Sequence, residues 1–192
     1  MMTVTLDRII RDYLALRGES PDLLPELEEG EDSAVLTLAR ALTVRLPEAA
    51  VEAVRATPRL ELEPTALTGV AASSGAPQAL RAATPVLTIR LPSDYLLFYS
   101  LRMQDWSEPL TALEPEGTLR RALGARAPAW MVCRHRPMAV EERDAEGRYL
   151  KVYGTEAAEQ PYELLYVRRP AFDGVVVTLP EAAYGRLLAA LA

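Results

Sequence analysis

The stretch over residues 91–113 constrains the fold most, because a helix-start signal, an aromatic stripe and an exit signal follow one another there without a break. Pro92 presets the backbone for a first helical turn, and the Ser-Asp pair after it supplies oxygen acceptors for the free amides of that turn. Trp106 and the Pro after it end the helix near Met103. The stripe has the three-and-four spacing of one helix face and consists of Tyr95, Phe98, Tyr99 and Arg102. We therefore expect a central helix whose aromatic face packs into a core.

Further helices are expected on both sides of this stretch. Residues 5–17 carry apolar side chains at helical spacing, with Thr5 as a cap and Gly18 just past the end. Apolar periodicity also predicts a helix over residues 33–46. Two more helices each begin with a proline at the first position, over residues 47–56 and 180–192.

Strand patterns fill the region before the last helix. Each is a short apolar run or an alternation of apolar and polar residues, bounded by Pro, Gly or Asp. They cover residues 129–134, 138–143, 148–153, 162–168 and 175–177. The sequence DAEG at residues 144–147 predicts a hairpin turn, and hence antiparallel pairing of its two neighbours.

These elements predict an α+β fold in a single domain spanning residues 1–192. The N-terminal helices and the C-terminal helix are expected to form a bundle, with a small antiparallel sheet or partial barrel inserted before the last helix. The expected parts are a helical part (1–58), an irregular connector (59–90), the central helix with a meander (91–128), the antiparallel β part (129–178) and the C-terminal helix (179–192). The structural anchors expected in the core are Tyr95, Phe98, Tyr99, Trp106 and Trp130.

The composition narrows the classes of partner. Apolar residues make up 49% of the chain and charged residues 25%, which is typical of a folded globular protein. The net charge of -6 argues against a sequence-specific nucleic-acid binder, because such proteins need a basic surface. No stretch is long and apolar enough to cross a bilayer, and the N-terminus lacks a signal-peptide pattern, so we expect no membrane contact.

The charges are unevenly distributed along the chain. Acidic residues without any basic neighbour occupy residues 19–32, whereas arginines crowd the later half. Two interpretations stay open: two solvated faces, or contacts between opposite patches of neighbouring subunits. The residues that we expect to make such subunit or partner contacts are Glu28, Glu29, Arg120, Arg121, Arg168 and Arg169.

No pattern in the chain predicts catalysis, a cofactor or a metal site. Cys133 and His135 are the single cysteine and the single histidine, and on a strand they would share one face. The sequence offers no third orienting residue or oxyanion loop beside them. The glycines are scattered singly, so no phosphate-binding loop is predicted. We therefore expect a protein that is not an enzyme and that binds no cofactor.

Two segments carry a resemblance to a known family. They are LPSDYLLFYSLRMQDWSEPL, residues 91–110, and VTLPEAAYGRLLAALA, residues 177–192. With the order of helices and strands around them, they resemble the head-to-tail connector proteins of tailed bacteriophages and prophages, of the adaptor or tail tubular protein A type. The likeness covers the last hundred residues best.

The resemblance implies a structural virion protein that acts by assembly. About a dozen copies would form a homo-oligomeric ring between the portal protein and the tail proteins, with the helical bundle as its wall. Assembly would take place in the cytoplasm of the bacterial host. The alternative is a host-encoded α+β binding or assembly module whose partner the sequence does not identify.

Overall fold

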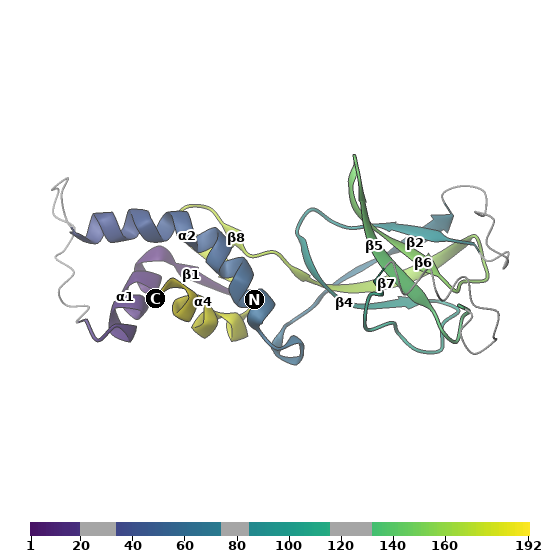
Figure 1. Ribbon diagram of the computed structural model, residues 1–192, viewed down its shortest axis with the longest axis horizontal. Coiled ribbons are helices and arrows are strands. Elements are labelled where there is room, and N and C mark those ends of the chain that lie inside the picture. Colours follow the sequence, from purple (N-terminus) through teal and green to yellow (C-terminus); the bar gives the residue numbers. More distant parts are fainter. Residues whose placement is uncertain (20–33, 74–84, 116–131) are drawn as a thin grey trace. The chain divides into compact units, whose positions relative to one another are not determined.

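Figure 1 shows the computed structural model, which describes residues 1–19, 34–73, 85–115 and 132–192. The chain divides into two compact units. Met1–Glu63 and Arg169–Ala192 form one, which we call the terminal unit because it holds both chain ends. Pro64–Arg168 form the other, which we call the central unit. The single-domain organisation expected from the sequence stays a prediction, because compact contacts do not test whether each unit folds alone.

The protein is mostly β, and the expected α+β fold around an N-terminal helical bundle is wrong. Strands account for 40% of the structure and helices for 30%. The described residues contain three α-helices and two antiparallel sheets. The correction has a simple cause: several segments that read as helix or as irregular connector pair as strands.

The terminal unit combines helices with a small sheet. Its strands have the order β1-β9-β8, with bounds β1 Met2–Thr5, β8 Ala171–Phe172 and β9 Val176–Leu179. Its helices are α1 Leu6–Leu16, α2 Ala34–Ala56 and α4 Tyr184–Leu191, with short 3-10 turns at η2 Arg59–Glu61 and η4 Glu181–Ala183.

The first helix forms as its end signals predict. The Thr5 hydroxyl accepts a hydrogen bond from the amide of Arg8 at 3.3 Å, and Gly18 takes a positive φ of 73° just beyond the end. α4 packs against both α1 and α2. The Tyr184 hydroxyl donates to the Asp12 carboxylate at 2.6 Å, which ties the last helix to the first.

The second helix runs through Pro47, where the sequence predicted a break between two helices. Continuity follows from packing, because Leu42, Leu46 and Ala50 are all buried on one side of α2. The Arg45 guanidinium donates to the carbonyl oxygens of Leu191 at 3.0 Å and of Ala190 at 3.3 Å. It thereby satisfies free carbonyls at the end of α4.

The central unit is a six-stranded antiparallel sheet that curls into a half-barrel. The strand order is β4-β7-β2-β3-β6-β5. The bounds are β2 Thr65–Ser73, β3 Leu87–Arg90, β4 Tyr95–Met103, β5 Met138–Asp144, β6 Gly147–Tyr153 and β7 Glu159–Arg168. The hairpin predicted at residues 144–147 is confirmed, since Asp144 pairs with Gly147 at the turn between β5 and β6.

The central helix predicted over residues 91–103 is wrong, because Tyr95–Met103 form strand β4. Two bulges interrupt its pairing with β7, between Tyr95 and Leu97 and between Phe98 and Ser100. Each bulge adds one residue to an alternating pattern, so the apolar spacing imitates the three-and-four spacing of a helix. Ahead of the strand, Pro92 begins a turn in which its carbonyl accepts from the Tyr95 amide at 3.0 Å.

The connector predicted over residues 59–90 is also wrong where it is described, since it contains β2 and β3. Strand β2 is rich in Ala, Thr and Gly, which have little strand signal of their own. Its pairing with β7 runs from Thr65 opposite Tyr166 to Ala72 opposite Glu159. Tertiary pairing therefore overrides weak local preference.

Both edge strands of the half-barrel are hydrogen-bonded to one connecting segment. In β4, Leu101 exchanges two backbone hydrogen bonds with Leu110, at 2.9 and 2.7 Å. Four residues later, the Glu114 amide donates to the Ala139 carbonyl of β5 at 2.9 Å. Part of each edge is thus covered, which removes backbone groups that could otherwise pair with another chain.

Candidate functional site: a groove in the terminal unit

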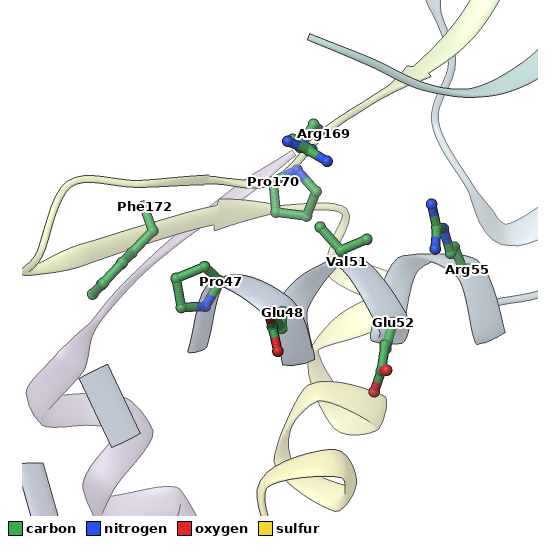
Figure 2. Close-up of a pocket in the computed structure, with 8 residues that line it drawn as sticks. All are labelled: Pro47, Glu48, Val51, Glu52, Arg55, Arg169, Pro170 and Phe172. Carbon is green, nitrogen blue, oxygen red and sulfur yellow. The ribbon is translucent and has the colours of Figure 1, made fainter. Parts of the chain in front are cut away.

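The described part of the terminal unit contains an open groove of about 560 Å³ between the second half of α2 and residues 169–172 (Figure 2). One wall is a single face of the helix, and the other is the chain entering β8. The lining residues are Pro47, Glu48, Val51, Glu52, Arg55, Arg169, Pro170 and Phe172.

The helical wall follows from spacing along α2. Residues 48, 51, 52 and 55 lie three or four positions apart and share one face. The opposite face carries Ala50, Ala53 and Val54, which are all buried in the unit. Burial of that face therefore turns the charged one toward the groove.

The centre of the groove is apolar. Val51, Pro170 and Phe172 are half-buried there, and Pro47 lies beside Phe172 at one end, with Arg55 at the other (Figure 2). Pro170 has no amide proton and stands directly before the two-residue strand β8. The wall opposite α2 is accordingly short and presents side chains more than backbone donors.

Four charged side chains surround this apolar centre: Glu48, Glu52, Arg55 and Arg169. All four are exposed. Within the described residues, none of them has a side-chain hydrogen bond or an ion pair. The groove thus offers two carboxylates and two guanidinium groups whose hydrogen-bonding capacity is not used by any other described residue.

One cluster of charged residues in the central unit, unlike those of the groove, is paired within the chain. The Arg148 side chain donates to Glu141 at 2.6 Å and lies over the Tyr95 ring at 4.7 Å, and the Tyr95 hydroxyl donates to Glu141 at 3.3 Å. Burial, followed by the nearby Glu141 charge, raises the pKa of Tyr95 well above its ordinary value. This cluster joins edge strand β4 to β5 and β6, so its role is to hold the half-barrel in its curl.

A second paired cluster lies at the β5–β6 hairpin. Arg90 contacts Asp144 at 2.7 Å and Glu146 at 2.7 Å. Nearby, Lys151 contacts Glu142 at 2.7 Å. Burial alone would raise the pKa of Glu142, but the hydrogen bonds from Lys151 and Tyr149 outweigh it, and the pKa lies below its usual value.

The sequence-predicted contact residues divide between the two units. Arg168 ends β7 in the central unit and forms an ion pair with Asp94 at 3.2 Å. Arg169 begins the second segment of the terminal unit and lines the groove. The other predicted contacts, Glu28, Glu29, Arg120 and Arg121, lie outside the described residues.

The predicted anchors lie in the central unit. Tyr95 and Trp106 are buried, and the Trp106 indole donates to the Gly154 carbonyl at 3.2 Å. Phe98 packs against the core from a partly buried position, and Tyr99 is partly buried. Trp130 lies outside the described residues.

Cys133 and His135 lie in a tight turn and not on a strand as predicted. Cys133 and Arg136 exchange backbone hydrogen bonds at 3.3 and 2.8 Å, which places His135 at the tip of the turn. The Cys133 side chain is exposed. The His135 ring accepts a hydrogen bond at Nε2 from the Arg134 side chain, 3.0 Å away. The pair therefore lacks the buried, oriented setting of a thiol nucleophile and its base.

The described residues also bear on metal binding and on membrane insertion. Among them, no three or more His, Cys, Asp or Glu side chains gather closely enough to hold a metal ion. Their helices also include none with the length and apolarity that a bilayer span requires.

No protein-family model matches the chain, and no curated protein is significantly similar to it.

Sequence reasoning missed most of the groove. Of its lining residues, only Arg169 was singled out as a contact residue. Arg55 and Arg169 are far apart in the chain, and no local pattern links them. One signal was present: the charged positions 48, 52 and 55 recur at helical spacing on the solvent face of an otherwise small-residue helix.

Proposed function

We propose that the protein is a structural subunit of the head-to-tail connector of a tailed bacteriophage or prophage. In this proposal, copies of the chain form a homo-oligomeric ring between the portal protein and the tail proteins of the virion, and the chain acts by assembly. The observation that carries the proposal is the groove of the terminal unit, with its apolar centre and its four charges that have no partner within the described ranges.

Such a groove suits contact with another protein better than chemistry on a small molecule. Its charged side chains are exposed and of both signs, whereas catalytic acids and bases usually lie in a pocket that excludes water. An apolar centre with a polar, charged rim is the usual composition of a protein–protein interface. Charges without a partner in the described part of the chain can pair with opposite charges that another protein supplies.

The resemblance of residues 91–110 to connector proteins supplies the biological setting. Within that stretch Tyr95–Met103 form strand β4, and the protein is mostly β, so the ring in this proposal has no wall made from an N-terminal helical bundle. The half-barrel instead presents a sheet surface, and the groove presents a helix surface. Two different surfaces on one chain are what a head-to-tail ring requires.

The experiment is to purify the protein and measure its assembly state over a wide range of concentrations. Native mass spectrometry and negative-stain electron microscopy are expected to show closed rings of uniform size. The same protein, co-expressed with the portal and tail proteins of its own virion, is expected to co-purify with at least one of them. A chain of similar size and charge that is unrelated to virions is the control for nonspecific capture.

A protein that stays monomeric at high concentration and co-purifies with neither portal nor tail protein would contradict the proposal. The groove would then favour the second candidate function, a binding module for a protein segment of another kind. Neighbouring genes that encode no capsid, portal or terminase protein would point the same way.

A further inference from the structure

The half-barrel has one outer face whose charges are unpaired, as in the groove. It is formed by β4, β7 and β2, where the register places Arg102 opposite Glu163 and Glu163 opposite Thr68. Glu159 lies four residues before Glu163 on β7, on the same face, about 13 Å away. The side chains of Arg102, Glu159 and Glu163 are exposed, and within the described residues none has an ion-pair partner.

The remainder of this face is small and uncharged. Val70, 65% exposed, lies opposite Pro161, and Ala66 lies opposite Leu165. We call this surface, made of the outward side chains of β4, β7 and β2, the plain face. Glu163 projects from the middle strand β7 at its centre, and the outward side chains beside it on β2 are short.

The other half of the outside, over β3, β6 and β5, is unlike it. There Arg90, Glu142 and Lys151 all have ion-pair partners within the same chain. The two halves of one sheet therefore differ in whether their charges are already satisfied. The plain face is the half that has charges left for a partner.

We infer that the plain face of one copy docks into the groove of the next copy. The inference rests on the proposed function and names the two surfaces through which the ring closes. Glu159 and Glu163 of the plain face meet Arg55 and Arg169 of the groove. Arg102 of the plain face meets Glu48 and Glu52 of the groove. Val70 and Pro161 cover the apolar centre of the groove.

The occupant is a second copy of this chain because the charge patterns complement one another. The groove has two arginines and two glutamates, and the plain face has two glutamates and one arginine. The contact joins different surfaces on the two copies, so repetition closes a ring when the rotation per copy allows it. A plain face packed on another plain face would give a dimer and no ring.

The test uses charge reversal on each surface separately. Arg55→Glu with Arg169→Glu reverses the groove, and Glu159→Arg with Glu163→Arg reverses the plain face.

Each double variant alone is expected to shift the assembly midpoint, measured by sedimentation velocity, at least tenfold toward higher concentration. An equimolar mixture of the two is expected to assemble again, because the reversed groove then meets the reversed face. Arg40→Glu with Arg186→Glu is the control for the groove variant, with the same charge change on exposed residues outside both surfaces. Circular dichroism checks that every variant is folded.

The outcomes separate this inference from the proposed function. If wild-type rings form and neither reversal weakens them, or if the mixture stays monomeric, the groove-to-face contact is wrong while the ring stands. If the plain-face variant alone disrupts assembly and the species formed by wild type is a dimer, a face-to-face contact replaces it. If wild type does not self-associate, the inference fails, and the proposed function fails with it unless the portal or tail protein binds.

Discussion

The two groups of charges in this protein differ in where their partners lie. Around the β5–β6 hairpin, Arg90 is paired with Asp144 and Glu146 of the same unit. In the groove of the terminal unit, Arg55 and Arg169 line an open space and have no such partner among the described residues. The first arrangement joins β3 to the β5–β6 hairpin. The second leaves interaction energy available for a partner, so loss of its charges is expected to affect assembly and not folding.

Backbone edges show the same contrast. Residues 110–114 bond to both edge strands of the half-barrel, whereas the small sheet of the terminal unit ends at β8 beside the groove. The central unit thus covers part of both its sheet edges, whereas the edge of the small sheet at β8 borders the groove.

The largest loss of stability is expected from Trp106→Ala in the core of the central unit. The ring is 3% exposed in the main core, and its loss leaves a cavity and an unpaired Gly154 carbonyl. We expect the free energy of unfolding, measured with urea, to fall by about 3–5 kcal/mol. Leu60→Ala is the control, because that side chain is 93% exposed and its removal should change little. Equal stability of the two variants would contradict the assigned core.

Gly154→Ala tests the turn that receives the Trp106 hydrogen bond. Gly154 has a φ of 87°, and a Cβ there would meet the Cys133 carbonyl oxygen at 2.6 Å. We expect a loss of about 1–3 kcal/mol in unfolding free energy. Gly185→Ala in helix α4, where a Cβ meets nothing within 4 Å, is the matched change and should stabilise the protein by up to about 1 kcal/mol. Thermal denaturation should show a lower melting temperature for Gly154→Ala and a higher one for Gly185→Ala.

Glu141→Ala removes the carboxylate that joins Tyr95 to Arg148. The Glu141 and Arg148 side chains are 28% and 40% exposed, so solvent screening limits the loss in unfolding free energy to about 1 kcal/mol. Glu163→Ala is the control, since that carboxylate is on the plain face and unpaired within the described chain. A larger loss of unfolding free energy in Glu163→Ala than in Glu141→Ala would contradict the assignment of Glu141 as the paired carboxylate and Glu163 as the unpaired one.

The pH dependence of stability tests the Glu142–Lys151 pair. The pKa of Glu142 lies below its ordinary value in the folded protein, so its contribution is present above the unfolded pKa of about 4.5 and is lost as pH falls through the folded pKa. The Glu142 hydrogen bond raises the pKa of Lys151, so that contribution is present below the ordinary pKa of 10.5 and is lost as pH rises through the folded value. Lys151→Gln should thus be less stable than wild type by up to about 1 kcal/mol at pH 7. Urea titrations at pH 7 and pH 3 should show that difference shrinking at the lower pH; a constant difference would mean that the pair does not act through charge.

The smallest stability effect is expected in the groove. Arg55→Glu with Arg169→Glu should change the unfolding free energy of the dilute protein by less than about 0.5 kcal/mol, because neither side chain has a partner to lose in the described chain. A loss of several kcal/mol would show that these arginines hold the terminal unit together, and the groove would lose its role as a free surface.

Sequence patterns predict the elements whose signals are local. Thr5 and Gly18 mark the ends of α1, and the DAEG turn fixes the register of the β5–β6 hairpin. Strand β4 could not be recognised, because its two bulges disturb the alternation that identifies a strand. Strand β2 was missed because its small residues acquire strand geometry from pairing with β7.

The candidate site was less predictable than the fold. Arg169 was predicted as a contact residue because it belongs to a basic pair with Arg168. The two arginines lie in different units, and Arg168 forms an ion pair with Asp94. The groove arises only when α2 buries its alanine face and β8 packs beside it. Such proximity depends on tertiary packing, which neither periodicity nor composition reports.

The central claim is that the groove is the surface covered on assembly. Hydrogen–deuterium exchange of the intact protein, compared between dilute and concentrated samples, tests it most directly. The account predicts slower exchange at high concentration in the peptide that contains residues 169–173, with the β5–β6 hairpin unchanged. Slower exchange confined to the hairpin, or no change in residues 169–173 while rings form, would contradict it.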